Sequence, residues 1–159
     1  MGLTIQLVIL LIACIPVIIN AHIEQNYKNQ ISRLKNELLN NESLFNDVVD
    51  AVKEINIEDD FLVKYDDTNN VSILSGRKYI EIDEEQMISI KEKYLLLKSE
   101  PKYISSSEKK NVISFSYTSR NGLNSYMQIY LIHFDNMSEE INGSEILSSH
   151  WALKIRGLV

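Results

Sequence analysis

Histidine and carboxylate side chains are the residues of this sequence best suited to acid–base or metal chemistry, and few of them lie close together. His133 and Asp135 are two residues apart in an apolar stretch, and His150 follows further along the chain. Two imidazoles and one carboxylate begin a metal site, but a closed site needs a further ligand. We therefore expect two histidines at the surface of a sheet, with no metal site and no cofactor.

The short motifs that mark common active sites are missing from the sequence. It contains no phosphate-binding glycine loop, no Gly-x-Ser-x-Gly turn and no His-Glu-x-x-His zinc motif. Its acidic clusters, at residues 58–60 and 83–85 for example, lack the spacing of an EF-hand loop. The sequence therefore predicts no catalytic residues and a protein that is not an enzyme.

Composition and charge exclude further classes of protein. Hydrophobic residues make up 45% of the 159 residues and charged residues 24%, which is typical of a globular chain. The net charge of −6 argues against nonspecific binding of nucleic acid. Cys14 is the only cysteine, so the chain has no internal disulfide.

The strongest signal is an apolar stretch at the N-terminus, because residues 3–20 contain no charged side chain. As a helix, residues 3–21 would be about 28 Å long, close to the hydrocarbon thickness of a bilayer. Pro16 interrupts the stretch, and transmembrane helices tolerate proline. We expect residues 1–21 to form a transmembrane anchor in which the following residues contact lipid: Leu7, Leu10, Leu11 and Pro16.

Two other interpretations of this stretch remain open. Residues 16–21 resemble a processing region, in which case a signal peptide is cleaved after Ala21. Residues 11–14 resemble the lipobox of bacterial lipoproteins, although apolar residues and Pro16 follow Cys14.

The positive-inside rule taken alone places the domain in the cytoplasm. A short N-terminal anchor before a folded domain is more often an export signal, so we expect a single-pass protein of the cell membrane with an extracytoplasmic domain.

A heptad pattern follows the apolar stretch and predicts a helical stalk over residues 22–42. We expect this stalk to pair as a coiled coil, either with a second copy or with another membrane-anchored protein. Asn41 has two interpretations: a polar residue in the coiled-coil core, or part of a helix break at which Asn41 or Ser43 caps a second helix. The expected association residues are Tyr27, Ile31, Leu34, Leu38 and Asn41.

Residues 43–159 predict an α+β domain with a small antiparallel sheet of about six strands and packed helices. Alternating apolar residues mark the strands, and Asn121-Gly122 between two of them is a hairpin signal. Asp83 with Gln86 three residues later is typical of a helix N-terminus. The expected order is therefore helix, three strands, helix, three strands.

The order of elements is similar to that of profilin-like and PAS/Cache-like sensor domains, which would imply ligand sensing outside the cytoplasm. The N-terminal residues Gly2-Leu3-Thr4, the apolar helix with Pro16 and the amphipathic extension also look like a type IV pilin, which would imply a filament subunit. Position 7 is leucine, where pilins usually have glutamate. From the residues themselves we expect a non-enzymatic accessory or scaffold subunit of a membrane-associated assembly, acting through protein–protein interaction.

Overall fold

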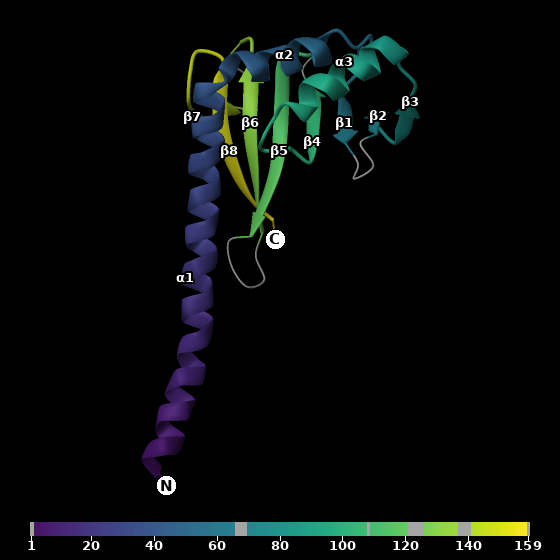
Figure 1. Ribbon diagram of the computed structural model, residues 1–159. Helices are drawn as coiled ribbons and strands as arrows, with labels where there is room; N and C mark the ends of the chain where they lie inside the picture. Colours follow the sequence, from purple (N-terminus) through teal and green to yellow (C-terminus); the bar gives the residue numbers. More distant parts are fainter. Residues whose placement is uncertain (1, 66–69, 108, 121–125, 137–140, 159) are drawn as a thin grey trace.

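Three helices and eight strands make up the part of the chain that the computed structural model describes (Figure 1). The described residues are 2–65, 70–107, 109–120, 126–136 and 141–158, and for residues 2–13, 120 and 158 only the backbone is described. The elements are α1 (Gly2–Asn40), α2 (Glu42–Lys53), β1 (Phe61–Tyr65), β2 (Val71–Ser75), β3 (Lys78–Ile80), α3 (Glu84–Leu95), β4 (Tyr103–Ser107), β5 (Val112–Arg120), β6 (Tyr126–Phe134), β7 (Glu145–Ile146) and β8 (Trp151–Leu158).

The strands form one antiparallel sheet in the order β3-β2-β1-β4-β5-β6-β8-β7, so the predicted α+β class is confirmed. The number of strands is eight, not about six. The sequence prediction missed β4, in which three consecutive serines replace the usual alternation of apolar and polar residues. It also missed β7, because a two-residue strand leaves no period to detect.

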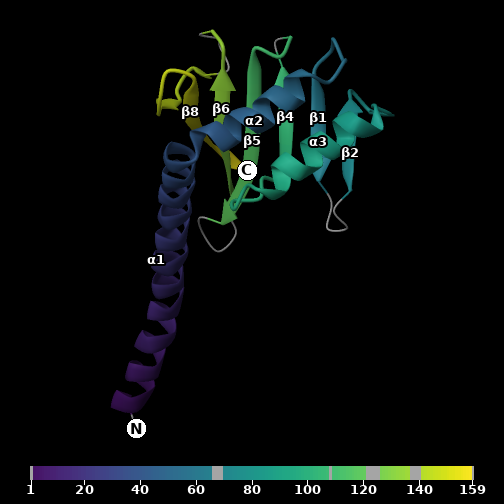
Figure 2. The same ribbon diagram turned by 45° about the horizontal axis from the view of Figure 1, so that its top comes forward.

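All three helices lie on one face of the sheet, as the two views of the chain show (Figures 1 and 2). Alternate strand residues point to this face and form the main core with the helices. Its centre is aromatic: the rings of Phe45, Phe115 and Trp151 meet with centroids 5.6–5.7 Å apart. We call the opposite side of the sheet the open face.

The last turns of α1 belong to this core. Leu34 and Leu38 are fully buried, and Tyr27 and Ile31 are partly buried against the same cluster. The expectation that a partner helix covers the heptad residues is therefore wrong for Leu34 and Leu38, which the chain's own domain covers. The heptad pattern arises because one stripe of the helix packs on its own sheet, which has the same periodicity as a stripe facing a partner helix.

Asn41 separates two helices instead of lying inside a continuous one. α1 ends at Asn40 and α2 begins at Glu42. The side-chain amide of Asn41 donates a hydrogen bond to the carbonyl oxygen of Glu37 (3.0 Å), and the side chain makes no capping bond to α2. The helix-break interpretation is confirmed, but the amide closes the end of the first helix and does not cap the second.

Polar contacts fasten this end of α1 on two sides. The Glu37 carboxylate accepts hydrogen bonds from the backbone N–H groups of Lys98 (2.8 Å) and Ser99 (3.1 Å), in the loop after α3. The Lys35 ammonium group lies 2.6 Å from the carboxylate of Glu145 in β7. The helix that carries the N-terminal apolar stretch is thus fixed to the edge strand β7 and to the loop between α3 and β4.

Candidate functional site

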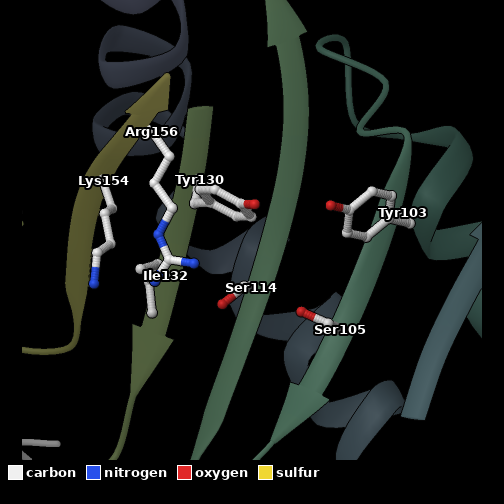
Figure 3. A pocket seen from close by; sticks show the side chains of 7 residues that line it. All are labelled: Tyr103, Ser105, Ser114, Tyr130, Ile132, Lys154 and Arg156. Atoms are coloured by element: carbon white, nitrogen blue, oxygen red, sulfur yellow. The ribbon is translucent and has the colours of Figure 1, made fainter. Parts of the chain in front are cut away.

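A hollow of about 260 Å³ opens on the open face of the sheet, where no helix covers the strands (Figure 3). Four neighbouring strands supply its walls, and the hydroxyls of Tyr103 and Tyr130 point toward each other across β5. The guanidinium group of Arg156 lies beside the Tyr130 ring. The lining residues are Tyr103 and Ser105 of β4, Ser114 of β5, Tyr130 and Ile132 of β6, and Lys154 and Arg156 of β8.

Strand register brings these side chains together. Tyr103 pairs with Ser116, Ser116 with Tyr130, and Tyr130 with Lys154, so one row of side chains crosses four strands. Paired residues of antiparallel strands point to the same face. The walls of the hollow therefore come from residues up to about 50 positions apart in sequence, and no local motif contains them.

Hydrogen bonds hold the tyrosine side of the hollow in place. The side-chain amide of Gln128 donates to the Ser116 hydroxyl (3.0 Å) and to the Tyr103 hydroxyl. Burial, together with a hydrogen bond to Tyr103, raises the pKa of Tyr130 to about 12. The Tyr130 phenol is therefore protonated at neutral pH, in its hydrogen bond with Tyr103.

Arg156 is held over an aromatic ring. Its guanidinium carbon lies 5.7 Å from the centroid of the Tyr130 ring, which is within the range of a cation–π contact. Such a contact reduces the freedom of the long side chain while leaving its N–H donors available. Lys154 lies two residues earlier on the same face of β8, so two positive charges line one side of the hollow.

Charge is segregated across the sheet, although the protein as a whole is acidic. Within the strands as described, Glu145 is the only carboxylate, and it lies on the helix side in its ion pair with Lys35. The open-face positions of the strands include Lys64, Lys154 and Arg156. The hollow thus has positive charge and hydroxyl groups, and neither carboxylate nor histidine is among its described lining residues.

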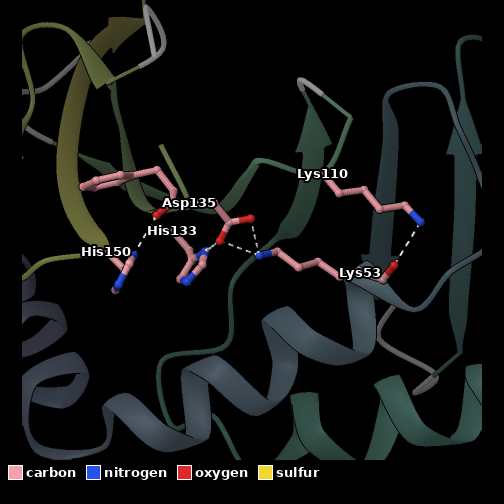
Figure 4. A network of polar contacts seen from close by, with 6 residues as sticks. Lys53, Lys110, His133, Asp135 and His150 are labelled. Carbon is pink, nitrogen blue, oxygen red and sulfur yellow. Dashed lines mark hydrogen bonds and ion pairs between the residues drawn. The ribbon is translucent and has the colours of Figure 1, made fainter. Parts of the chain in front are cut away.

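The other polar cluster lies at the end of the sheet beside α2 (Figure 4). The rings of His133 and His150 stack at 5.9 Å. The expectation that both histidines lie at the surface of the sheet is wrong for His133, which is buried. Burial, with a smaller contribution from the nearby Lys53 ammonium group, lowers the pKa of His133 to about 4. The Asp135 carboxylate makes an ion pair with Lys53 at 2.6 Å. Its negative charge is thus balanced by Lys53, and His133 remains neutral.

This cluster does not assemble a ligand set for a metal ion. Across residues 2–65, 70–107, 109–120, 126–136 and 141–158, no three histidine, cysteine, aspartate or glutamate side chains come together as such a group. The Nδ1 atom of His133 is buried and has no hydrogen-bond partner among the described residues. We interpret the cluster as part of the packing between α2 and the sheet.

The predicted anchor residues fall partly outside the described side chains. Leu7, Leu10 and Leu11 are within α1, but their side chains are not described, and Pro16 is exposed within the same helix. Among the side chains that are described, from Cys14 onward, no helix is long and apolar enough to cross a membrane.

The residues of the hollow were not recognised in the sequence. The only trace of the hollow in the sequence is the alternation of β8. Trp151 and Leu153 point to one face of this strand, and Lys154 and Arg156 point to the other. These cations alone indicate only a solvent-facing side of a strand. Their proximity to Tyr103 becomes visible when β4 is placed, and β4 was missed.

Comparison of the chain with models of protein families, with curated proteins and with solved structures found no match. The function is therefore argued from the geometry of the chain itself.

Proposed function

We propose that the chain is a non-enzymatic, single-pass membrane protein that presents an α+β interaction domain, as an accessory or scaffold subunit of a membrane-associated assembly. The observation that carries this proposal is the continuity of α1. One helix runs from Gly2 to Asn40, and its last turns lie in the core of the domain. An anchor at the N-terminal end of this helix would hold the domain in a defined orientation.

The exposed residues of α1 support membrane insertion. The helix extends well past the sheet, with the N-terminus far from the domain (Figure 1). Val17 and Ile18 are 68% and 66% exposed, and Ile15 is 51% exposed. Exposure of each large aliphatic side chain to water costs roughly 1.5–3 kcal/mol relative to burial. A bilayer around residues 1–21 would remove this cost, and the sequence before Cys14 contains no charged residue.

Membrane insertion is tested by fractionation. After alkaline carbonate extraction, full-length protein is expected in the membrane pellet. A double variant, Leu10→Lys with Leu11→Lys, is expected to shift it to the supernatant, because each lysine near the centre of a span costs about 2.5–3.5 kcal/mol. Leu39→Lys is the matched control, since Leu39 is exposed and lies near the far end of α1. A soluble species beginning at His22 would instead establish a cleaved signal peptide.

The same membranes report the side on which the domain lies. We propose that it is extracytoplasmic, and Glu58→Cys in a Cys14→Ser background places one thiol on the exposed surface of the domain. A membrane-impermeant maleimide should label this thiol on intact cells. Labelling that requires lysis would place the domain in the cytoplasm.

Association through α1 is proposed for the part of the helix outside the core. Because Leu34 and Leu38 are buried in the domain, a second copy or another anchored helix would meet α1 before Tyr27. Cys14 is exposed and is the only cysteine, so it reports on pairing. Mild oxidation of membranes is expected to give a disulfide-linked dimer that is lost in Cys14→Ser. A product of another mass would identify a different partner chain, and an unchanged monomer would contradict association here.

Ligand sensing is the second candidate, and the hollow on the open face favours it. A rigid helix between a membrane and a ligand-binding sheet would suit the transmission of a binding event. This candidate differs from a scaffold in requiring a specific small ligand for the hollow.

A further inference from the structure

We propose that the hollow on the open face binds the phosphoryl group of a small phosphate ester, with Arg156 and Lys154 as its charged contacts. The assignment follows from the lining of the hollow, and it holds whether or not the chain is anchored in a membrane.

The charge of the site determines the sign of its ligand. Lys154 and Arg156 face the hollow from one strand, and its other polar lining groups are the hydroxyls of Tyr103, Ser105, Ser114 and Tyr130. A carboxylate is absent from the lining as described, although the protein has a net charge of −6. Among the described lining residues a cation would find no anionic ligand, whereas an anion would meet the guanidinium group of Arg156, with Lys154 beside it, in a setting that is partly shielded from water.

The number of donors favours a dianion with several acceptor oxygens. The guanidinium group has five N–H donors and the ammonium group three, and each hydroxyl can donate one hydrogen. A phosphate monoester carries a charge of about −1.5 to −2 at neutral pH and has three strong acceptor oxygens. A monocarboxylate has a smaller charge and two acceptor oxygens instead of three, so it would make fewer contacts with the guanidinium and ammonium groups.

Parts of the site are ordered before any ligand arrives. Gln128 donates to the Tyr103 hydroxyl, and the ring of Tyr130 supports the guanidinium group of Arg156. Ser114 is nearly buried at the floor of the hollow, between Ser105 of β4 and Ile132 of β6. Ordering of the contacts in advance lowers the entropic cost of binding. The cavity of about 260 Å³ is large enough for a phosphoryl group and a few further carbon atoms, so the ester is small.

Calorimetry on the full-length chain in detergent micelles tests the proposal, with inorganic phosphate and glycerol phosphate as probes and chloride at constant ionic strength. We expect saturable binding of both probes. Arg156→Gln and Lys154→Gln should each weaken binding roughly tenfold, because each removes a charge-assisted contact to the dianion. Lys64→Gln is the matched control, since Lys64 is an open-face cation of β1 outside the hollow. It should leave the affinity unchanged.

Tyr130→Phe separates the ring from the hydroxyl. It retains the surface under Arg156 and removes one donor, so a smaller loss than that of Arg156→Gln is expected. Circular dichroism of each variant checks that the sheet remains folded. The proposal is overturned if neither probe binds, if acetate binds as tightly as phosphate, or if Lys64→Gln weakens binding as much as Arg156→Gln.

A second arm identifies the source of the phosphoryl group. Mixed micelles with phosphatidate are compared with mixed micelles of phosphatidylcholine. Binding of glycerol phosphate that phosphatidate does not inhibit supports a soluble ester. If phosphatidate inhibits the binding of glycerol phosphate, and if Arg156→Gln abolishes the effect of phosphatidate, a lipid headgroup is supported as the source of the phosphoryl group.

Discussion

Leu34→Ala is expected to lower the free energy of unfolding of the domain by about 2–5 kcal/mol, the range for removal of a large aliphatic side chain from a packed core. Leu34 has no exposed surface and lies in the cluster that α1 shares with α2 and the sheet. Trp151 is the only tryptophan and is fully buried, so its fluorescence during urea denaturation measures the transition directly.

Leu39→Ala is the control for this experiment. Leu39 is 54% exposed on the same helix, and its replacement should change stability by no more than about 0.5 kcal/mol. Leu34→Asp should prevent folding altogether, because it places an unpaired carboxylate in the core. Equal effects of Leu34→Ala and Leu39→Ala would show that α1 is a separate stalk and that the core begins after it.

The burial of Leu34 and the exposure of Leu39 on one helix show how far the sequence defines the fold. A heptad pattern establishes that a helix has one apolar stripe, but it does not say whether a partner chain or the same chain covers the stripe. The apolar stripe of α1 packs against β5 and α2, and the positions of these two elements depend on contacts between distant residues. The break at Asn41 was visible as one of two interpretations, because the residues Asn-Asn-Glu-Ser suit both a cap and a coiled-coil core.

Signals that reside in one short segment were reliable. Asp83 is the N-cap of α3, as predicted, and its carboxylate accepts a hydrogen bond from the Glu85 N–H (3.0 Å). The partner expected in the capping box, Gln86, instead donates to the carbonyl oxygen of Glu54. The alternating residues of β5 and β6 predicted their antiparallel pairing, while the turn residues Asn121 and Gly122 lie outside the described residues. Local propensity thus located element ends, and tertiary contacts decided what the side chains bind.

The hollow could not be predicted from one sequence, because it too is formed by residues that are distant in the chain. It depends on the register of four strands, and one of them, β4, has a sequence of low hydrophobicity. A shift of one residue in β8 would turn Lys154 and Arg156 to the helix side. Burial of Trp151 and Leu153 on that side sets the register, so the aromatic core indirectly positions the cations of the open face.

Stability is expected to fall as the pH drops from about 6.5 to about 4, and His133 is expected to account for roughly 3 kcal/mol of the loss. Burial first, and then the charge of Lys53, lowers the pKa of His133 from 6.5 to about 4 in the folded protein, while the charges of Asp135 and Asp50 oppose this shift. Between these values the unfolded chain binds a proton that the folded chain does not. Protonation therefore favours the unfolded state as the pH falls, and this contribution is absent above about pH 7.

Urea denaturation of wild type and His133→Leu from pH 7.5 to pH 4 measures this contribution as a difference, in which the titration of other groups cancels. Leucine has no titratable group, and the buried Nδ1 atom has no hydrogen-bond partner to lose among the described residues. His133→Leu should therefore lose less stability on acidification than wild type. Leu131→Ala, a buried variant of the same strand without a titratable group, should show a difference from wild type that does not change with pH. A constant difference for His133→Leu as well would mean that His133 takes up its proton in the folded protein as readily as in the unfolded chain.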